Sequence, residues 1–174
     1  MGFITRIRFG TRIGSLALGV VALAAATAAV TGGGTALASR APAASGTEHL
    51  QLMSTSATSN KASIIVSGVF TAGGVDVQGN KTDTVKFSNG SFKIAHSNGT
   101  GTQKFNPTTC LMSLQLHGTY KISNGTGAYK GISGHGKYQL SILGVAARVN
   151  GKCSQKAAPI AFQQLIKASG PVSL

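Results

Sequence analysis

The strand pattern that decides the fold is clearest in CLMSLQLHGTYKI, residues 110–122. Every second residue, from Cys110 through Met112 and Leu114 to Ile122, is apolar, aromatic or glycine, whereas most of the residues between them are polar. A period of two puts the two sets on opposite faces of a β-strand. The stretch therefore predicts a long strand that buries one face.

The same alternation recurs along the rest of the chain. It predicts strands at 49–57, 62–71, 73–79, 82–88, 91–97, 109–123, 135–149 and 158–169. Asn-Gly pairs, which favour tight hairpin turns, occur at 89–90, 98–99, 124–125 and 150–151. Strands that are apolar on one face must close on themselves or pack on a second sheet.

These strands predict an all-β fold with a single domain over residues 49–174. We expect one small antiparallel β-barrel of eight strands. A two-sheet sandwich is the alternative. The chain has 24 glycines, and the bends and bulges that glycine permits are needed to close a barrel.

The first 38 residues have the layout of an export signal. Arg6, Arg8 and Arg12 come first without an acid, and residues 16–30 are uncharged and almost wholly apolar. That run is shorter than the roughly 20 apolar residues of a membrane-spanning helix. The segment therefore predicts a signal peptide that is removed on secretion.

Small residues mark where the signal would be cut. The preferred site lies between Ala38 and Ser39, and a second lies between Ala43 and Ala44. Residues 39–48 are expected to form a flexible leader.

Both cysteines, Cys110 and Cys153, follow the predicted signal. An even number of cysteines in an exported chain predicts a disulfide. A redox or metal pair is not favoured, because no C-x-x-C spacing occurs and neither cysteine has a histidine or an acid beside it. The sequence thus predicts one disulfide in a secreted domain.

The chain is strongly basic, with 16 Lys plus Arg, 3 Asp plus Glu and a net charge of +13. The signal holds three of the arginines and no acid, so the mature chain would carry +10. Alternation puts several lysines on outward faces: Lys86, Lys93, Lys121, Lys137 and Lys167. Such lysines keep a protein soluble and protect strand edges, and this is the preferred explanation. The alternative is that a basic exterior binds an anionic wall polymer or membrane surface. Nucleic acid is disfavoured because the chain has no Trp and few aromatic residues for stacking.

A glycine-rich segment, NGTGAYKGISGHG at residues 124–136, carries a family resemblance. It resembles the turn in allene oxide cyclase-like and dirigent-like barrels. The resemblance implies a small eight-stranded antiparallel barrel with an interior cavity. Plant members of the two families act on a bound fatty-acid epoxide and on phenoxy radicals. None of their functional residues matches a position here, so none is carried over.

Two polar residues fall on faces that are otherwise apolar, Asp83 and His96. A hairpin centred on Asn89-Gly90 would make them cross-strand neighbours, and such a pair serves as a general base or as a charge pair. Glu48 falls in the predicted leader, so Asp83 is the one carboxylate on which an enzymatic interpretation rests.

Three further residues are candidates for ligand contact. Tyr120 and Tyr138 would line a cavity or the core, and Arg148 would anchor an anion or lie at a solvated strand end. The histidines lack metal-binding spacing, so no metal and no cofactor is predicted.

The leading hypothesis is a secreted barrel that binds a small apolar or amphipathic ligand in its cavity without catalysis. One alternative is an isomerase or cyclase of the allene oxide cyclase-like type that works through Asp83 and His96. Another is a cationic protein that binds the cell surface or cell wall. Enzymatic activity is left open and not favoured.

Overall fold

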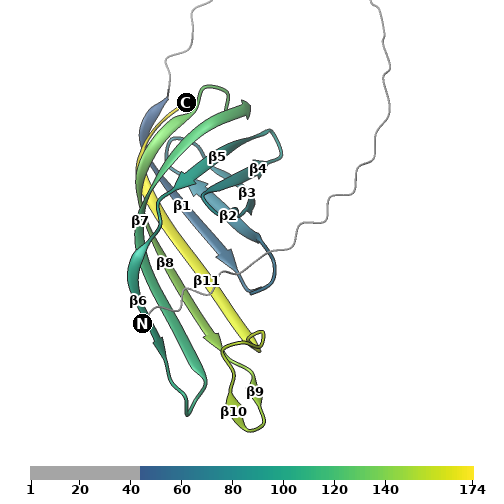
Figure 1. Ribbon diagram of the computed structural model, residues 1–174. Coiled ribbons are helices and arrows are strands. Elements are labelled where there is room, and N and C mark those ends of the chain that lie inside the picture. Colours follow the sequence, from purple (N-terminus) through teal and green to yellow (C-terminus); the bar gives the residue numbers. More distant parts are fainter. Residues whose placement is uncertain (1–43) are drawn as a thin grey trace, which may run out of the picture. The chain divides into compact units, whose positions relative to one another are not determined.

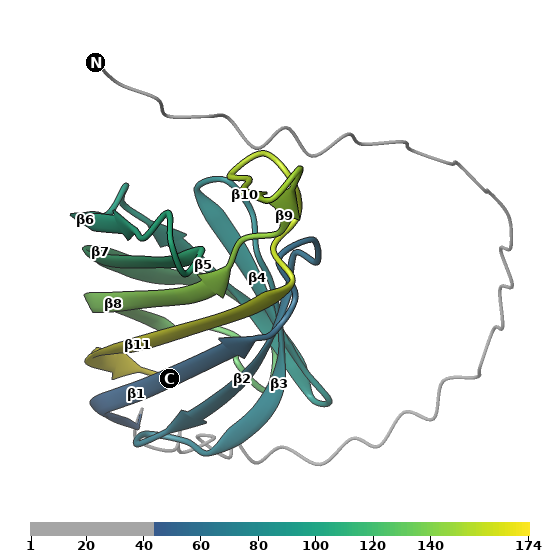
Figure 2. The same ribbon diagram turned by 90° about the horizontal axis from the view of Figure 1, so that it is seen from below.

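Eight antiparallel strands close into a barrel (Figures 1 and 2). The structure is a computed structural model and describes residues 44–174. The barrel strands are β1 (Ser45–Ser54), β2 (Lys61–Ser67), β3 (Ala72–Val77), β4 (Thr82–Phe87), β5 (Gly90–His96), β7 (Leu111–Gly127), β8 (Ser133–Val145) and β11 (Ala161–Ser173). β5 pairs with β7, and β1 pairs with both β2 and β11, which completes the ring. The predicted all-β, eight-stranded antiparallel barrel is confirmed.

Three strands are longer than the others and project beyond the ring. β7 has 17 residues, and β8 and β11 have 13 each, whereas β3 and β4 have six. The projecting part of β7 pairs with a ninth strand, β6 (Thr100–Phe105). A small hairpin of β9 (Arg148–Val149) and β10 (Lys152–Cys153) follows β8, as Figure 1 shows.

The sequence did not predict β6. Five of its six residues are exposed, and the strand hydrogen-bonds only to β7. Without a buried face it has no alternation of polar and apolar residues to reveal it.

Four aromatic side chains close one end of the barrel interior. They are Phe70, Phe87, Phe92 and Tyr129. Their ring centroids lie 5.0–6.4 Å apart, in the tilted and edge-to-face arrangements that aromatic pairs prefer. Tyr129 comes from the glycine-rich segment, so this segment folds back over the barrel end.

The Asn-Gly pairs play different parts in the fold. Asn150-Gly151 forms the two-residue hairpin turn between β9 and β10, with φ of 51° and 76°. The β4–β5 turn uses Ser88-Asn89, one position earlier than predicted, because Phe87 pairs with Gly90.

The other two pairs were wrongly predicted to be hairpins. Asn124-Gly125 lies inside β7, where the pairing with β5 shifts by one residue and Asn124 has a φ of 56°. This is a β-bulge, which bends a strand where a barrel must curve. Asn98-Gly99 separates β5 from β6, and these two strands pair with successive parts of β7.

The predicted flexible leader is partly a strand. Residues 45–48 belong to β1 and pair with residues 170–173 of β11. The pairing satisfies their backbone groups and buries the Glu48 side chain. The predicted signal peptide, the cut sites and residues 39–43 lie outside the described residues. Residues 44–174 contain no helix long and apolar enough to cross a membrane.

The predicted disulfide is confirmed between Cys110 and Cys153, which are 43 positions apart. Cys110 immediately precedes β7, and Cys153 lies on β10. The bridge therefore ties the β9–β10 hairpin to the start of the longest strand.

Candidate functional site

The barrel interior contains a cavity of about 190 Å³. Its apolar lining comes from several strands: Leu50, Leu52, Ile94, Leu140, Ile166 and Ala168. Its polar lining consists of Gln78, Asp83, His96, Tyr120, Tyr138 and Gln164. Asp83 and Phe87 lie toward opposite ends of β4, so the polar groups around Asp83 are remote from the aromatic end. The cavity thus has an apolar wall and a polar end.

Asp83 and His96 meet at this polar end. Asp83 Oδ1 lies 3.4 Å from His96 Nε2, an ion pair when the imidazole is protonated. The same Oδ1 accepts a hydrogen bond of 2.8 Å from the Gly79 N–H. The contact is the one that the alternation of β4 and β5 predicted.

The register that produces this contact differs from the predicted one. Asp83 pairs with Ile94, two residues before His96. The two side chains therefore meet diagonally on the inner face, within the reach of such neighbours. The difference arises at the turn, where Phe87 pairs with Gly90.

Asp76 is a second carboxylate beside this pair. It lies on β3 opposite Val85 of β4, and both side chains are fully buried. Burial, reinforced by the Asp83 carboxylate, raises the pKa of Asp76 to about 7. Burial also raises the pKa of Asp83, while the Gly79 hydrogen bond and His96 oppose the shift. Burial thus favours the protonated form of both carboxylates at this end of the barrel.

Glu48 is a third buried carboxylate, farther along the interior. Its Oε2 accepts a 3.2 Å hydrogen bond from the Phe70 N–H, and its Oε1 has no partner. Burial raises the pKa of Glu48. Burial, with the charge of Glu48 adding to it, raises the pKa of Tyr120 to about 12. The buried Tyr120 hydroxyl, also without a partner, is thus a hydrogen-bond donor in the cavity wall at neutral pH.

The expectation that Asp83 is the one interior carboxylate was wrong. Glu48 could have been found by extending the period of β1 backwards, since Glu48, Leu50 and Leu52 share the buried face. Asp76 gives no such signal. It lies between two valines, yet it is fully buried while Val75 is 42% exposed.

Tyr120 and Tyr138 both line the cavity, as the sequence predicted for a barrel with an interior site. The Tyr138 hydroxyl donates a 3.0 Å hydrogen bond to the Ser97 carbonyl. Its ring centroid lies 6.4 Å from that of His96, with an edge-to-face geometry. Tyr138 therefore packs edge-to-face on the imidazole at the polar end of the cavity.

Arg148 does not line the cavity and is exposed, which agrees with the expected solvated strand position and not with an anion anchor in the cavity. It lies on β9, and its guanidinium donates to the carbonyls of Thr108 (2.6 Å) and Gly151 (3.2 Å). The bond to Thr108 joins the β9–β10 hairpin to the loop before β7, and the bond to Gly151 lies within the hairpin. In residues 44–174 no group of three or more His, Cys, Asp or Glu side chains is placed to hold a metal ion.

The chain was compared with protein families, curated proteins and solved structures. No family model, curated protein or solved structure matches it.

Proposed function

We propose that this protein is a secreted barrel that binds a small amphipathic ligand in its interior cavity. The observation that carries the proposal is the cavity of about 190 Å³ with an apolar wall and a polar end. Ligand sites in proteins combine such apolar walls with a few polar groups that fix orientation.

The lining orients the ligand. Its apolar part would lie against Leu52, Ile94 and Ile166, and its polar group would meet Asp83 and His96. The volume equals roughly six water molecules at about 30 Å³ each, which suits one small ring. Beyond the cavity, Leu114 and Ile142 pair on the inner face of β7 and β8 and continue its apolar surface. The longer part of a larger ligand would lie there.

Indole is a suitable probe because the protein has no Trp, so indole fluorescence has no tryptophan background. Binding should shift the indole emission to shorter wavelength and saturate. Leu140→Phe fills the cavity and should weaken binding by at least about tenfold, equivalent to 1.4 kcal/mol. Leu143→Phe is the control, since Leu143 lies on the same strand and is 49% exposed. Equal binding by the two variants would contradict the proposal.

Export and family membership are part of the same proposal. The basic and apolar N-terminal segment and the Cys110–Cys153 bridge support secretion, because disulfides persist in oxidising compartments. N-terminal sequencing of protein from culture medium should begin at Ser39 or Ala44. The glycine-rich segment and the closed barrel support a relationship with the allene oxide cyclase-like barrels.

A second candidate function is acid–base isomerisation or cyclisation in the same cavity. The 3.4 Å contact between Asp83 and His96 favours it, because a carboxylate that orients an imidazole is a common general base. Ligand recovered from the native protein would be incubated with fresh protein and followed by NMR. Conversion to an isomer that Asp83→Asn abolishes, without loss of indole binding, would establish catalysis. An unchanged ligand supports binding alone.

A further inference from the structure

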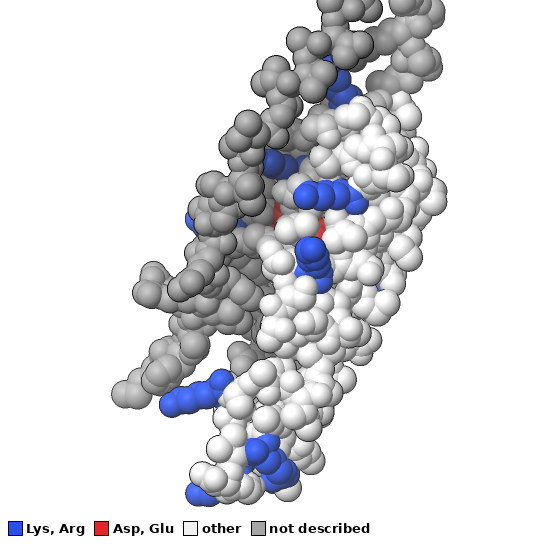
Figure 3. Space-filling view, turned by 90° about the vertical axis from the view of Figure 1, so that its right-hand side faces the viewer, with Lys and Arg blue, Asp and Glu red and all other residues white. Residues whose placement is uncertain are grey.

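The folded protein separates its charges by sign. Glu48 and Asp76 are fully buried, and Asp83 is 8% exposed. The other charged side chains of residues 44–174 are eleven lysines and Arg148. In Figure 3 the lysines and arginines stand out from the surface, whereas acidic atoms are visible only in a recess. Over the described residues the exterior is therefore positive almost without compensation.

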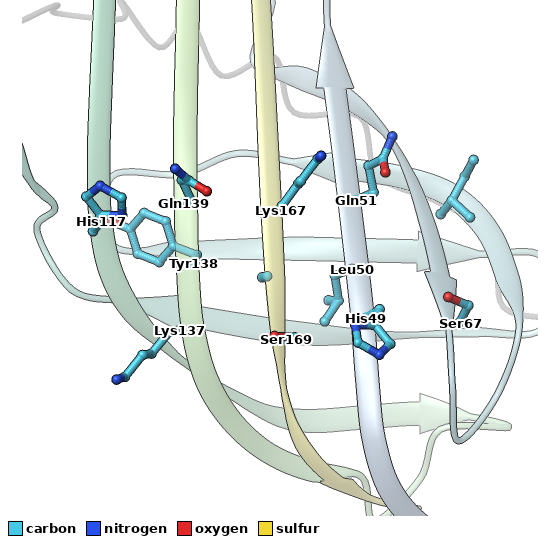
Figure 4. A pocket seen from close by; sticks show the side chains of 12 residues that line it. His49, Leu50, Gln51, Ser67, His117, Lys137, Tyr138, Gln139, Lys167 and Ser169 are labelled. Atoms are coloured by element: carbon cyan, nitrogen blue, oxygen red, sulfur yellow. The ribbon is translucent and has the colours of Figure 1, made fainter.

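On one part of this exterior, the strand register aligns outward side chains of neighbouring strands in rows. A surface pocket of about 530 Å³ lies over the outer faces of β1, β11, β8 and β7. Two rows of outward side chains cross it, as Figure 4 shows. The first row is Gln51, Lys167, Gln139 and His117. The second row is His49, Ser169 and Lys137.

The basic side chains alternate between the rows, with one on each strand. His49 on β1 and Lys137 on β8 belong to the second row, and Lys167 on β11 and His117 on β7 belong to the first. Successive members are therefore diagonal neighbours on adjacent strands. Such neighbours lie about 7–8 Å apart. We call these four residues the basic zigzag.

We propose that the basic zigzag binds a linear anionic polymer in which phosphodiesters join short polyols, as in cell-wall polymers of the poly(glycerol phosphate) type. Each glycerol phosphate repeat has six backbone bonds. An extended chain spans at most about 3.6 Å for every three bonds, so the phosphates recur every ~7 Å. This repeat is comparable to each diagonal step of the zigzag, and the long lysine side chains let a flexible chain follow its turns. Gln51, Gln139 and Ser169 lie between the basic residues and offer hydrogen bonds to the polyol hydroxyls.

The lining favours a polymer without bases. Tyr138 is its one Phe, Tyr or Trp residue, and the Tyr138 hydroxyl donates to the Ser97 carbonyl while the ring also lines the interior cavity. Apart from the two imidazoles, the outer pocket thus offers no free aromatic ring for the base stacking that single-strand binders use. Phosphodiester charges alone would not distinguish this polymer from a single-stranded nucleic acid, so binding of both should be measured.

The test measures the affinity for a defined poly(glycerol phosphate) oligomer as a function of salt. The double variant Lys137→Gln/Lys167→Gln removes two charges from the zigzag. Lys86→Gln/Lys93→Gln removes the same charge from exposed positions on β4 and β5. The zigzag variant should bind at least about tenfold more weakly. Its affinity should also depend less on salt, so that the negative slope of log K against log salt becomes shallower by about 1.4. The control variant should stay within about twofold of wild type.

Three results would overturn the proposal. They are equal losses in the two double variants, no binding of the oligomer by the wild type, and tighter binding of oligothymidylate with the same number of phosphates. Leu140→Phe should leave oligomer binding unchanged, and Lys137→Gln/Lys167→Gln should leave indole binding unchanged. The cavity function and the zigzag can therefore fail independently. All four lysines are exposed, so circular dichroism should show the same fold in each variant.

Discussion

The ring of Tyr138 lies over its cross-strand partner Gly118, in the space that a side chain at position 118 would occupy. The tyrosine hydroxyl reaches the Ser97 carbonyl from this position. The same ring packs edge-to-face on His96. The absence of a side chain at position 118 is thus what lets an aromatic residue support the polar end of the cavity.

Gly118→Ala should destabilise the protein by about 1–3 kcal/mol, because the new methyl group meets the Tyr138 ring. Urea unfolding would measure the change. Tyr138→Phe keeps the ring and removes one hydrogen bond, so it should cost only about 0.5–1.5 kcal/mol. A Gly118→Ala variant as stable as wild type would show that the ring moves freely.

The stability of the protein should fall as the pH rises from about 4 to about 7. Burial raises the pKa of Asp76 from 3.8 to about 7, so the folded state binds this proton more tightly than the unfolded state. The free energy of unfolding then decreases with pH, by on the order of 4 kcal/mol for this group. Burial raises the pKa values of Glu48 and Asp83 in the same direction.

Asp76→Asn provides the control for this pH dependence. The amide cannot ionise, so the variant should lose the part of the slope that Asp76 contributes, and it should be more stable than wild type at pH 8. Urea midpoints at several pH values would test both statements. An unchanged slope would mean that Asp76 ionises in the folded protein without a penalty.

Removal of the disulfide should cost up to about 4 kcal/mol, the loop-entropy value for residues 43 positions apart. The bridge joins the β9–β10 hairpin to the start of β7, outside the closed ring, so the barrel should still fold. Cys153→Ser with Cys110→Ser should therefore lower the melting temperature and keep the β-sheet circular dichroism spectrum. Alkylatable thiols in the unreduced wild type would contradict the bridge.

Tyr129→Ala should be among the most destabilising single substitutions, by about 3–5 kcal/mol. The Tyr129 side chain is buried against Phe70, Phe87 and Phe92 at the closed end of the barrel. Lys130→Ala is a matched control because the next side chain is exposed. Thermal melts of the two variants would compare them directly, and similar melting temperatures would show that the aromatic end does not hold the barrel together.

Much of the fold could be predicted from local sequence. The period of two along β7 identified its buried face, and the same rule placed Asp83 and His96 on one side of the sheet. The two cysteines were enough to predict the bridge. These inferences succeed because side-chain direction in a strand depends only on residue parity.

Pairing between strands needed the tertiary structure. The bulge at Asn124-Gly125 and the one-position shift of the β4–β5 turn change which residues are partners, without altering the polar and apolar pattern of the strands. β6 is stabilised by hydrogen bonds to β7 and has no buried face, so its sequence shows no period.

The sequence by itself determined a basic chain of alternating strands with three acids after its signal-like segment. Only the tertiary structure decided that Asp76 points inward together with Glu48 and Asp83, and that basic residues on four strands form one zigzag. Asp76 lies between two valines, so its face was selected by the pairing of β3 with β2 and β4. The physical reason is that parity divides the residues of a strand into two faces, while closure of the barrel determines which face is inside.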